Sequence, residues 1–326
     1  MTKQRVMSAM RPTGRLHLGN YFGALDSWIK LQDKYECFHS VADWHALTTA
    51  YQESENIKEN ILQMAIDWLS VGLDPNKSAI YIQSSVKEIA ELHLLISMIV
   101  PVSWLERCPT YKDQLVQLKD REIATYGFLG YPNLMASDIL ICKASIVPVG
   151  EDQLPHLELA REIVRRFNFL YGETFPEPQA LLNEVKVLPG LDGRKMSKSY
   201  NNTILLSEDP DSARKKISMM ITDPARIRKN DPGHPEICSV FAFHKVFSQD
   251  IVEQREQECR AGQIGCVECK KQLADNVAAF LEPIYERHKE LEKNISFVYD
   301  VLEDGYKKIH PVAQATIEEV RTKMGL

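Results

Sequence analysis

Two short segments contain residue types suited to holding a nucleotide phosphate, and the first is "RPTGRLHLGNY" at residues 11–21. It follows a predicted strand and opens a predicted helix, whose N-terminus offers free N–H groups and partial positive charge to phosphate oxygens. Gly14 and Gly19 permit a nucleotide to approach closely, and the side chains of His17 and Asn20 can donate hydrogen bonds to it. Taken alone, the segment is equally well interpreted as a glycine-containing turn with an exposed histidine.

The second segment is "KMSKS" at residues 195–199, in which Lys195 and Lys198 lie three residues apart beside two serine hydroxyls. Gly190 and Gly193 precede it and predict a flexible loop. A reaction that releases pyrophosphate needs cations directed at the charge that develops on the leaving group. A mobile loop can bring such cations into place after the substrate binds. The alternative interpretation is a solvated lysine-rich loop.

The two segments, in this order around a predicted parallel sheet, resemble the class I aminoacyl-tRNA synthetases, whose signatures are His-Ile-Gly-His and Lys-Met-Ser-Lys-Ser. The first signature stands here as "HLGN", with Asn20 in place of the second histidine, and the second is unaltered. Asparagine keeps a hydrogen-bond donor at that position but supplies no titratable group. Over almost the whole chain the resemblance is to the tryptophanyl-tRNA synthetase subfamily, through "VADWHALTT", "LERCPTYKDQ", "YPNLMASDIL" and "VPVGEDQLPHLEL".

This resemblance implies an ATP-dependent attachment of L-tryptophan to tRNA(Trp) through a tryptophanyl-adenylate, with Mg²⁺ accompanying the ATP. The residues that it implies to be catalytic are Lys195, Lys198, Lys112 and His17. Those that it implies to bind ATP are Arg11, Pro12, Thr13, Gly19, Asn20, Gly150, Glu151, Asp152, Val187, Lys195, Met196, Ser197, Lys198 and Ser199. Three alternatives stay open: a tyrosyl-tRNA synthetase-like enzyme, a small-molecule nucleotidyltransferase, and a non-catalytic relative that binds tRNA.

For tryptophan itself, the resemblance implies that Asp138 accepts a hydrogen bond from the indole N–H. An indole ring has one donor and no acceptor, so an apolar pocket for it needs one fixed acceptor. An unmatched buried polar group would cost about 1 to 3 kcal/mol. Tyr131 and Gln153 are implied to lie near the amino group, and Met135, His45 and Val149 around the ring. Without the neighbouring motifs, Asp138 would be interpreted as an acidic residue facing water.

Four of the seven cysteines form a pattern, Cys238, Cys259, Cys266 and Cys269, with intervals of twenty, six and two residues. Zinc ribbons usually combine two close pairs, whereas four thiolates are the usual complement of a 4Fe–4S cluster. The segment "IGCVECKK" resembles the subset of tryptophanyl-tRNA synthetases that carries such a cluster in the helical domain, so the four cysteines are expected to be its ligands. Zinc and free thiols are the alternatives.

The elements that must position these residues divide the chain into two parts. Short β-rich runs, "RVMSAM", "CFHSVA", "AIYIQ" and "SIVPVG", alternate with helical stretches in the first part, such as one with Ser54 as its N-cap. After about residue 200 the periodicity is helical. We therefore expect an α/β fold with a Rossmann-like doubly wound parallel sheet and a C-terminal all-α domain. Residues 1–200 are expected to be catalytic and residues 201–326 to bind the anticodon.

Composition limits the partners. The chain has 326 residues, a net charge of −6 and no run that is long and apolar enough to span a bilayer or serve as a signal peptide. We therefore expect a cytoplasmic protein, in a reducing compartment that disfavours disulfides. A polyanion such as tRNA must meet a local basic surface, for which residues 214–216 and residues 226–229 are candidates. The resemblance also implies a homodimer.

Overall fold

The computed structural model describes residues 3–109, 111–113, 122–182 and 188–326, and its centre is a five-stranded, all-parallel sheet. The strands are β1 (Arg5–Met10), β2 (Glu36–Val41), β3 (Ser78–Ile82), β4 (Ile146–Val149) and β5 (Gln179–Leu182). Their order is β3-β2-β1-β4-β5. The chain thus builds the sheet outward from β1 in both directions, which confirms the expected doubly wound arrangement. In such a sheet, ligands bind beyond the carboxyl ends of the strands where the winding reverses, here β1 and β4.

The sequence pattern predicts four of these strands, each within one residue of its observed limits, and misses β5. That strand is four residues long, lies at the edge of the sheet and pairs only with β4. Its side chains are exposed or half-buried, so its sequence shows neither a continuous apolar run nor a clear alternation.

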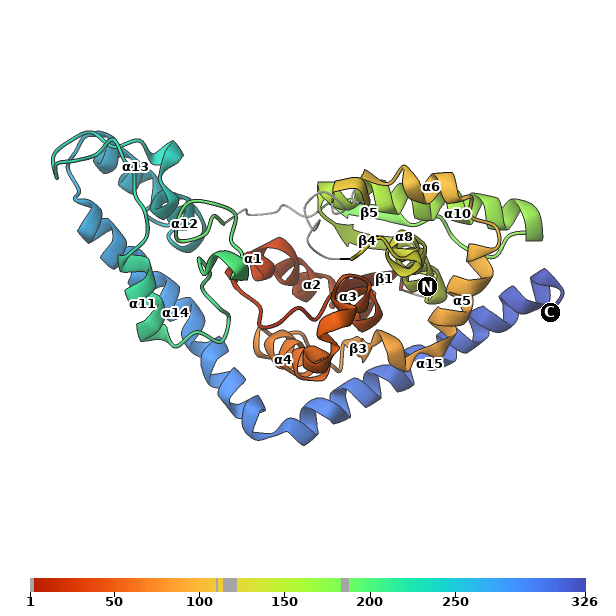
Figure 1. Ribbon diagram of the computed structural model, residues 1–326. Helices are drawn as coiled ribbons and strands as arrows, with labels where there is room; N and C mark the ends of the chain where they lie inside the picture. Colours follow the sequence, from red (N-terminus) through yellow and green to blue (C-terminus); the bar gives the residue numbers. More distant parts are fainter. Residues whose placement is uncertain (1–2, 110, 114–121, 183–187) are drawn as a thin grey trace. The chain divides into compact units, whose positions relative to one another are not determined.

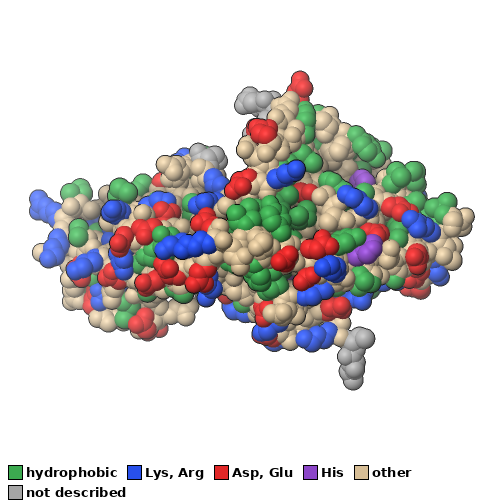
Figure 2. Space-filling view, turned by 90° about the horizontal axis from the view of Figure 1, so that it is seen from below, with side chains coloured by type: hydrophobic (Ala, Val, Ile, Leu, Met, Phe, Trp, Pro, Cys, Tyr) green, Lys and Arg blue, Asp and Glu red, His purple; other side chains and the backbone are tan. Residues whose placement is uncertain are grey.

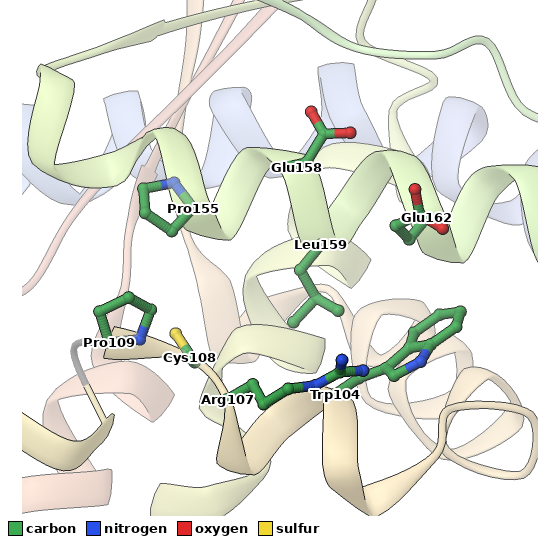
Figure 3. Close-up of a pocket in the computed structure, with 8 residues that line it drawn as sticks. All are labelled: Trp104, Arg107, Cys108, Pro109, Pro155, Glu158, Leu159 and Glu162. Carbon is green, nitrogen blue, oxygen red and sulfur yellow. The ribbon is translucent and has the colours of Figure 1, made fainter.

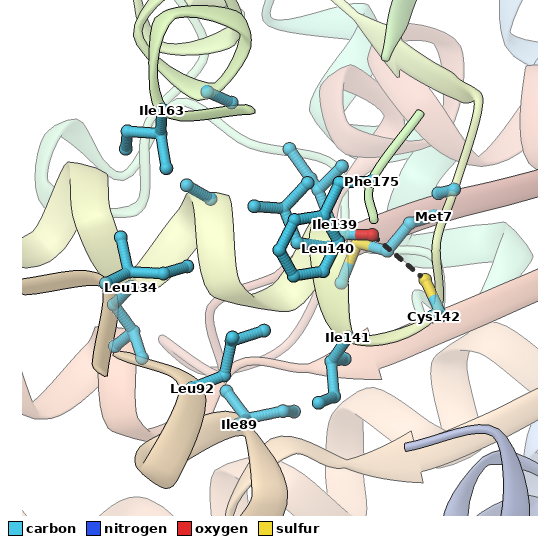
Figure 4. Close-up of a cluster of buried hydrophobic side chains, with 14 of the residues drawn as sticks. Met7, Ile89, Leu92, Leu134, Ile139, Leu140, Ile141, Cys142, Ile163 and Phe175 are labelled. Carbon is cyan, nitrogen blue, oxygen red and sulfur yellow. Dashed lines mark hydrogen bonds between the residues drawn. The ribbon is translucent and has the colours of Figure 1, made fainter. Parts of the chain in front are cut away.

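One face of the sheet packs against a large hydrophobic cluster. Strand residues Met7, Phe38 and Tyr81 project into it, and α5 (Lys87–Ser97), α9 (Tyr131–Ile141) and α10 (Leu154–Tyr171) cover it. Figure 4 shows side chains of α9 meeting those of α5 and α10 within this cluster. The helix α9 is buried along almost its whole length, so any polar side chain on it must find its partner inside the protein.

The opposite face of the sheet is covered by α2 (Asp26–Leu31) and α4 (Ile57–Ser70). On β2, Cys37 packs with Leu31, and the His39 ring stacks on Trp28 with their centroids 5.0 Å apart. The prediction that Ser54 caps this helix is wrong, because Ser54 lies in a preceding 3₁₀ turn, η2 (Tyr51–Asn56), and α4 begins at Ile57.

The last helix, α15 (Ile295–Met324), lies beside β3 at the edge of the sheet (Figure 1). Gly305 permits this, because a Cβ atom at Gly305 would lie 1.8 Å from the carbonyl oxygen of Ile80. Lys308 of α15 also donates hydrogen bonds to the carbonyl oxygens of Pro75 and of Ser78, the first residue of β3. The helical character expected of the C-terminal region is confirmed.

The chain forms two compact units. The first contains residues 1–14, 27–183 and 294–326, and the second contains residues 15–26 and 184–293. Helices of the second unit are α1 (Leu18–Asn20), the π-helix η1 (Tyr21–Leu25), α11 (Pro210–Ser218), α12 (Ser239–Phe247), α13 (Val252–Arg260) and α14 (Cys266–Lys293). The expected division into residues 1–200 and 201–326 assigns functions, catalysis to the first part and anticodon binding to the second. That assignment stays a prediction.

The remaining described elements are short. In the first unit they are α3 (Asp43–Ala50), η3 (Gln83–Ser85), α6 (Val102–Glu106), α8 (Tyr126–Leu129) and η4 (Glu151–Gln153), and in the second η5 (Lys198–Tyr200) and η6 (Pro235–Ile237). Basic and acidic side chains are interspersed over the face seen in Figure 2. Within the described part of the chain, no helix combines the length and the apolar character needed to cross a membrane.

Candidate active site

The first signature segment lies where a loop becomes a helix in the second unit. His17 has extended backbone and is the N-cap of α1, and its backbone N–H donates to the Oδ1 atom of Asn20 over 3.0 Å. A short ladder joins the segment to the loop that follows the second signature, because the N–H of Leu18 donates to Ile204 and that of Leu206 donates to Leu16. Backbone hydrogen bonds therefore tie the start of the segment "HLGN" to the loop at residues 204–206 before any ligand binds.

Gly19 brings the two signatures into contact. A Cβ atom at Gly19 would lie 3.0 Å from the ring of His17 and 3.5 Å from the Sδ atom of Met196, the methionine of "KMSKS". Met196 is itself buried. Burial, followed by the positive charge of Lys198, lowers the pKa of His17 to about 4. Its imidazole is therefore neutral at pH 7 and carries one N–H that it can donate.

Asn202 organises the loop that carries the lysines. Its amide nitrogen donates to the carboxylate of Asp192 over 2.7 Å and to the carbonyl of Lys195 over 3.1 Å, while its Oδ1 atom accepts from the N–H of Ser197. A Cβ atom at Gly190 would lie 2.2 Å from this amide, so the close approach requires glycine. Nothing in the sequence distinguishes Asn202 from its neighbour Asn201, and its role was missed.

The cationic side chains of the loop lie at the surface, while the hydrogen bonds from Asn202 hold its backbone in place. Lys195 and Lys198 are exposed, on either side of the buried Met196. Val187 and the side chain of Ser199 lie outside the described residues. The remaining lysine expected in catalysis, Lys112, is exposed and belongs to the first unit.

The other residues expected to bind ATP follow two adjacent strands of the first unit. Arg11, Pro12 and Thr13 come directly after β1, and Gly150, Glu151 and Asp152 come directly after β4. Because parallel neighbours end at the same edge of the sheet, both segments lie at the reversal point of the winding. This is the position at which a doubly wound sheet binds a nucleotide.

Asp138 lies at the centre of a buried network. It is 1% exposed on α9, and its carboxylate accepts hydrogen bonds from the amide of Gln83, 2.8 Å from each oxygen, and from the Nε2 atom of His45 at 3.0 Å. Gln83 is held in turn, because its Oε1 atom accepts from the backbone N–H groups of Trp44 and His45. The structure thus joins His45 to Asp138 by a hydrogen bond and adds Gln83, for which the sequence shows no local signal.

A second, partly buried chain of polar groups joins two other residues expected at the tryptophan site. His156 lies between them, with its Nε2 atom bonded to the hydroxyl of Tyr131 and its Nδ1 atom 3.1 Å from Oε1 of Gln153. Tyr131 also meets His45 edge to face, with ring centroids 6.0 Å apart. No local sequence pattern marks His156 as part of this site. Of the remaining residues expected around the indole ring, Val149 is buried on β4 and Met135 is half-buried on α9.

A cavity of about 490 Å³ lies elsewhere in the first unit, between the segment of α6 and one side of α10 (Figure 3). Its lining consists of Trp104, Arg107, Cys108, Pro109, Pro155, Glu158, Leu159 and Glu162. None of these is a residue that the sequence analysis assigned to catalysis or binding. The cavity therefore adds nothing to the interpretation of the signatures.

The four patterned cysteines all belong to the second unit. The Nη1 atom of Arg226 lies 3.8 Å from the Sγ atoms of both Cys259 and Cys266, and Sγ of Cys269 lies 3.3 Å from the Nε2 atom of His244. Burial, followed by the charges of the other three thiols, raises the pKa of Cys269 to about 12. The four thiols thus lie near enough to influence one another. Among the described residues, no group of three or more His, Cys, Asp or Glu side chains is placed to hold a metal ion.

The two basic clusters expected to contact tRNA are partly engaged within the protein. Arg214 pairs with Asp211 and Asp275, and Lys216 pairs with Glu208. Besides its contacts with the two thiols, Arg226 donates to the carbonyl oxygens of Lys229 and Ile264. Its guanidinium group therefore organises the loop rather than projecting from it.

Known proteins resemble the chain over its whole length. The sequence model of the family described as "tRNA synthetases class I (W and Y)" matches residues 1–282. A tryptophan–tRNA ligase of Thermotoga maritima is 51% identical, with 99% of each chain covered, and that of Aquifex aeolicus is 47% identical, with 99% of this chain and 100% of the other covered.

Solved structures agree with the sequence comparison. The tryptophanyl-tRNA synthetase of Campylobacter jejuni, determined with ADP and tryptophan, superposes with a TM-score of 0.89 at 38% identity and covers 99% of this chain and 100% of its own. Matches of this length and identity, together with two signatures that meet at Gly19 and Met196, leave no doubt about the family. The chain belongs to the class I tRNA synthetases of the W and Y family.

Proposed function

We propose that this protein attaches L-tryptophan to tRNA(Trp) at the expense of ATP. The geometry that carries the proposal is the contact between the two signature segments, which places the neutral His17 and the "KMSKS" loop side by side in one unit. The choice of tryptophan is supported by the relatives, because the ligases of Thermotoga maritima and Aquifex aeolicus align over their full length.

The first step is attack by a carboxylate oxygen of tryptophan on the α-phosphorus of ATP. A bond forms between that oxygen and phosphorus, and the bond from phosphorus to the bridging oxygen breaks, so that pyrophosphate leaves and tryptophanyl-adenylate remains. The attacking carboxylate is already ionised, so positioning and charge stabilisation contribute more than proton transfer. Lys195 and Lys198 stabilise the charge on the departing pyrophosphate, Lys112 is a further phosphate ligand, and His17 donates a hydrogen bond to a phosphate oxygen. Mg²⁺ bound to ATP would share the same charge.

In the second step a hydroxyl of the terminal ribose of the tRNA attacks the carbonyl carbon of the adenylate and releases AMP. We assign residues 1–200 to the catalytic part and the helical residues 201–326 to anticodon binding. In the two basic clusters, Lys215, Arg228 and Lys229 are the side chains best suited to meet phosphate, since each is exposed. Such contacts would make tRNA binding weaken as salt is raised.

Selection of tryptophan is assigned to the network around Asp138. A carboxylate offers about four acceptor sites, and the two partners in the network leave capacity for the indole N–H. Replacing Asp138 by alanine is expected to weaken tryptophan binding in a titration by roughly tenfold or more. An unaltered affinity would refute the role assigned to Asp138.

One assay separates this proposal from its alternatives. Purified protein is incubated with ATP, tRNA and either tryptophan or tyrosine, and charged tRNA and adenylate are measured separately. Charging with tryptophan alone supports the proposal, and charging with tyrosine supports the tyrosyl-specific alternative. Adenylate without charged tRNA would indicate a small-molecule nucleotidyltransferase.

We further propose that Cys238, Cys259, Cys266 and Cys269 hold a 4Fe–4S cluster, which would brace the helical part. Its support is the family resemblance and the mutual proximity of the four thiols. Four cysteine thiolates would supply the usual ligand set of such a cluster. Anaerobically purified protein should be brown and contain iron and acid-labile sulfide. Colourless protein with stoichiometric zinc would favour the zinc alternative.

Homodimer formation in the cytoplasm is the last part of the proposal. Leu94 and Met98 are 53% and 67% exposed at a spacing of four residues, and Val102 is 58% exposed just beyond them. Such a row of apolar side chains would be covered if a second copy of the chain packed on it. Light scattering should give the mass of a dimer, and replacing Met98 by aspartate should shift it toward that of a monomer. An unchanged dimer in this variant would place the interface elsewhere.

A further inference from the structure

His156 is a buried histidine that the proposed reaction does not use directly. It is 1% exposed on α10, and it bonds through its two ring nitrogens to Tyr131 and Gln153, the residues assigned to the amino group of tryptophan. Its ring also meets that of Tyr131 with centroids 5.2 Å apart. A single side chain therefore fixes both residues.

The chemistry of the three groups sets the direction of each hydrogen bond. The Oε1 atom of Gln153 can only accept, so Nδ1 of His156 carries the proton and donates it. Burial lowers the pKa of His156 to about 4, so the ring is neutral at pH 7 and its Nε2 atom is an acceptor. The hydroxyl of Tyr131 must then donate to Nε2.

This ordering has a consequence for a bound cation. The proton of Tyr131 is directed at the imidazole, so toward any other group its hydroxyl oxygen can act only as a hydrogen-bond acceptor. The amide nitrogen of Gln153 donates to the carboxylate of Asp152 over 2.8 Å, which fixes the amide and leaves Oε1 with a second acceptor site. Both residues are thus arranged to accept hydrogen bonds, as a group with three N–H donors requires.

We infer that His156 is a positioning residue that orients Tyr131 and Gln153 as acceptors for the α-ammonium group of the amino-acid substrate. The inference rests on the proposed binding of tryptophan. A neutral donor in place of either acceptor would repel the ammonium protons, so the histidine selects for an amino acid over the corresponding deaminated acid.

The test compares two ligands that differ only in the ammonium group, L-tryptophan and indole-3-propionate. In the variant His156→Leu the affinity for L-tryptophan should fall roughly tenfold or more, because two hydrogen bonds that fix the acceptors are lost. The affinity for indole-3-propionate should change less than about twofold. In pyrophosphate exchange, KM for tryptophan should rise while KM for ATP stays unchanged.

Matched variants distinguish positioning from folding. His39→Leu removes another buried histidine of the same unit and should leave both affinities unchanged. His156→Gln, which can still accept from Tyr131, should restore part of the affinity for tryptophan. Tyr131→Phe removes only the hydroxyl and should reproduce the loss if His156→Leu does not fold.

Two results would overturn the inference. One is an equal loss of affinity for both ligands in His156→Leu and Tyr131→Phe, and the other is no loss for either ligand. The variant Asp138→Ala serves as the reference, because it should weaken both ligands through the indole N–H. If Asp138→Ala weakens the binding of both L-tryptophan and indole-3-propionate, the tryptophan pocket is correctly assigned, even where the inference about His156 fails.

Discussion

Gly19 and Met196 lie against each other although they are far apart in the sequence: a Cβ atom at Gly19 would be 3.5 Å from the Sδ atom of Met196 and 3.0 Å from the ring of His17. The glycine is therefore where the two signatures of the family meet. The backbone of Gly19 does not have a positive φ, so glycine is required here only because a Cβ atom would lie too close to the His17 ring.

Gly19→Ala tests this contact. Alanine fits the backbone, but its Cβ atom at 3.0 Å must displace the His17 ring by a few tenths of an ångström. Catalytic groups are sensitive to such displacement, since a shift of about 1 Å can slow a reaction roughly 100-fold. We expect tryptophan-dependent pyrophosphate exchange to slow at least tenfold, with thermal stability retained. Gly23→Ala is the matched control, since nothing lies within 4 Å of its added Cβ atom. Equal exchange rates in the two variants would show that the contact has no catalytic role.

Lys195→Ala and Lys198→Ala test the charge stabilisation. Each change removes a cation from the exposed side of the loop, whose backbone Asn202 continues to fix. We expect kcat for pyrophosphate exchange to fall by roughly 100-fold or more, while tryptophan binding changes little. Lys34→Ala, at an exposed lysine of the first unit, should leave both quantities unaltered. Wild-type exchange rates in both loop variants would exclude the proposed mechanism.

These examples indicate what the sequence can and cannot specify. The signatures and the strands β1 to β4 were predictable, because each depends on a local pattern, whereas Asp138 was singled out only through the family resemblance. Gln83, which holds Asp138, was not predictable, because the two residues are 55 positions apart and meet only through the register of the sheet against α9. The same applies to His156, which contacts Tyr131 across 25 positions. Buried polar partners are set by tertiary packing, so a single sequence gives no local signal for them.

His39 should make the stability of the protein depend on pH. It is fully buried on β2, neither ring nitrogen has a hydrogen-bond partner among the described residues, and burial lowers its pKa to about 3. Between pH 6.5 and pH 3 the unfolded chain therefore binds a proton at His39 that the folded chain does not, so stability falls as the pH falls. From pH 7 to pH 4 this amounts to a loss on the order of 3 kcal/mol.

The variant His39→Phe keeps an aromatic ring to stack on Trp28 and has no group that titrates. The difference in unfolding free energy between it and the wild type, measured by urea denaturation at pH 7 and pH 4.5, should move in favour of the variant at the lower pH. A difference that is constant with pH would mean that His39 binds its proton equally in the folded and unfolded states.

Gly305→Ala tests how α15 is held against the sheet. In an open helix alanine would stabilise the protein by about 1 kcal/mol relative to glycine. Here the added Cβ atom would lie 1.8 Å from the carbonyl oxygen of Ile80, which belongs to the backbone of β3 and cannot rotate away. We therefore expect the sign to reverse, with a net loss of about 1 to 3 kcal/mol or more from overpacking. Gly127→Ala in α8, whose nearest neighbour would be 3.9 Å away, is the control and should be neutral or stabilising in thermal unfolding. A Gly305→Ala variant as stable as this control would show that α15 can shift along β3 at no cost in free energy. The stability of this edge of the sheet would then not depend on the close approach of Gly305 to Ile80.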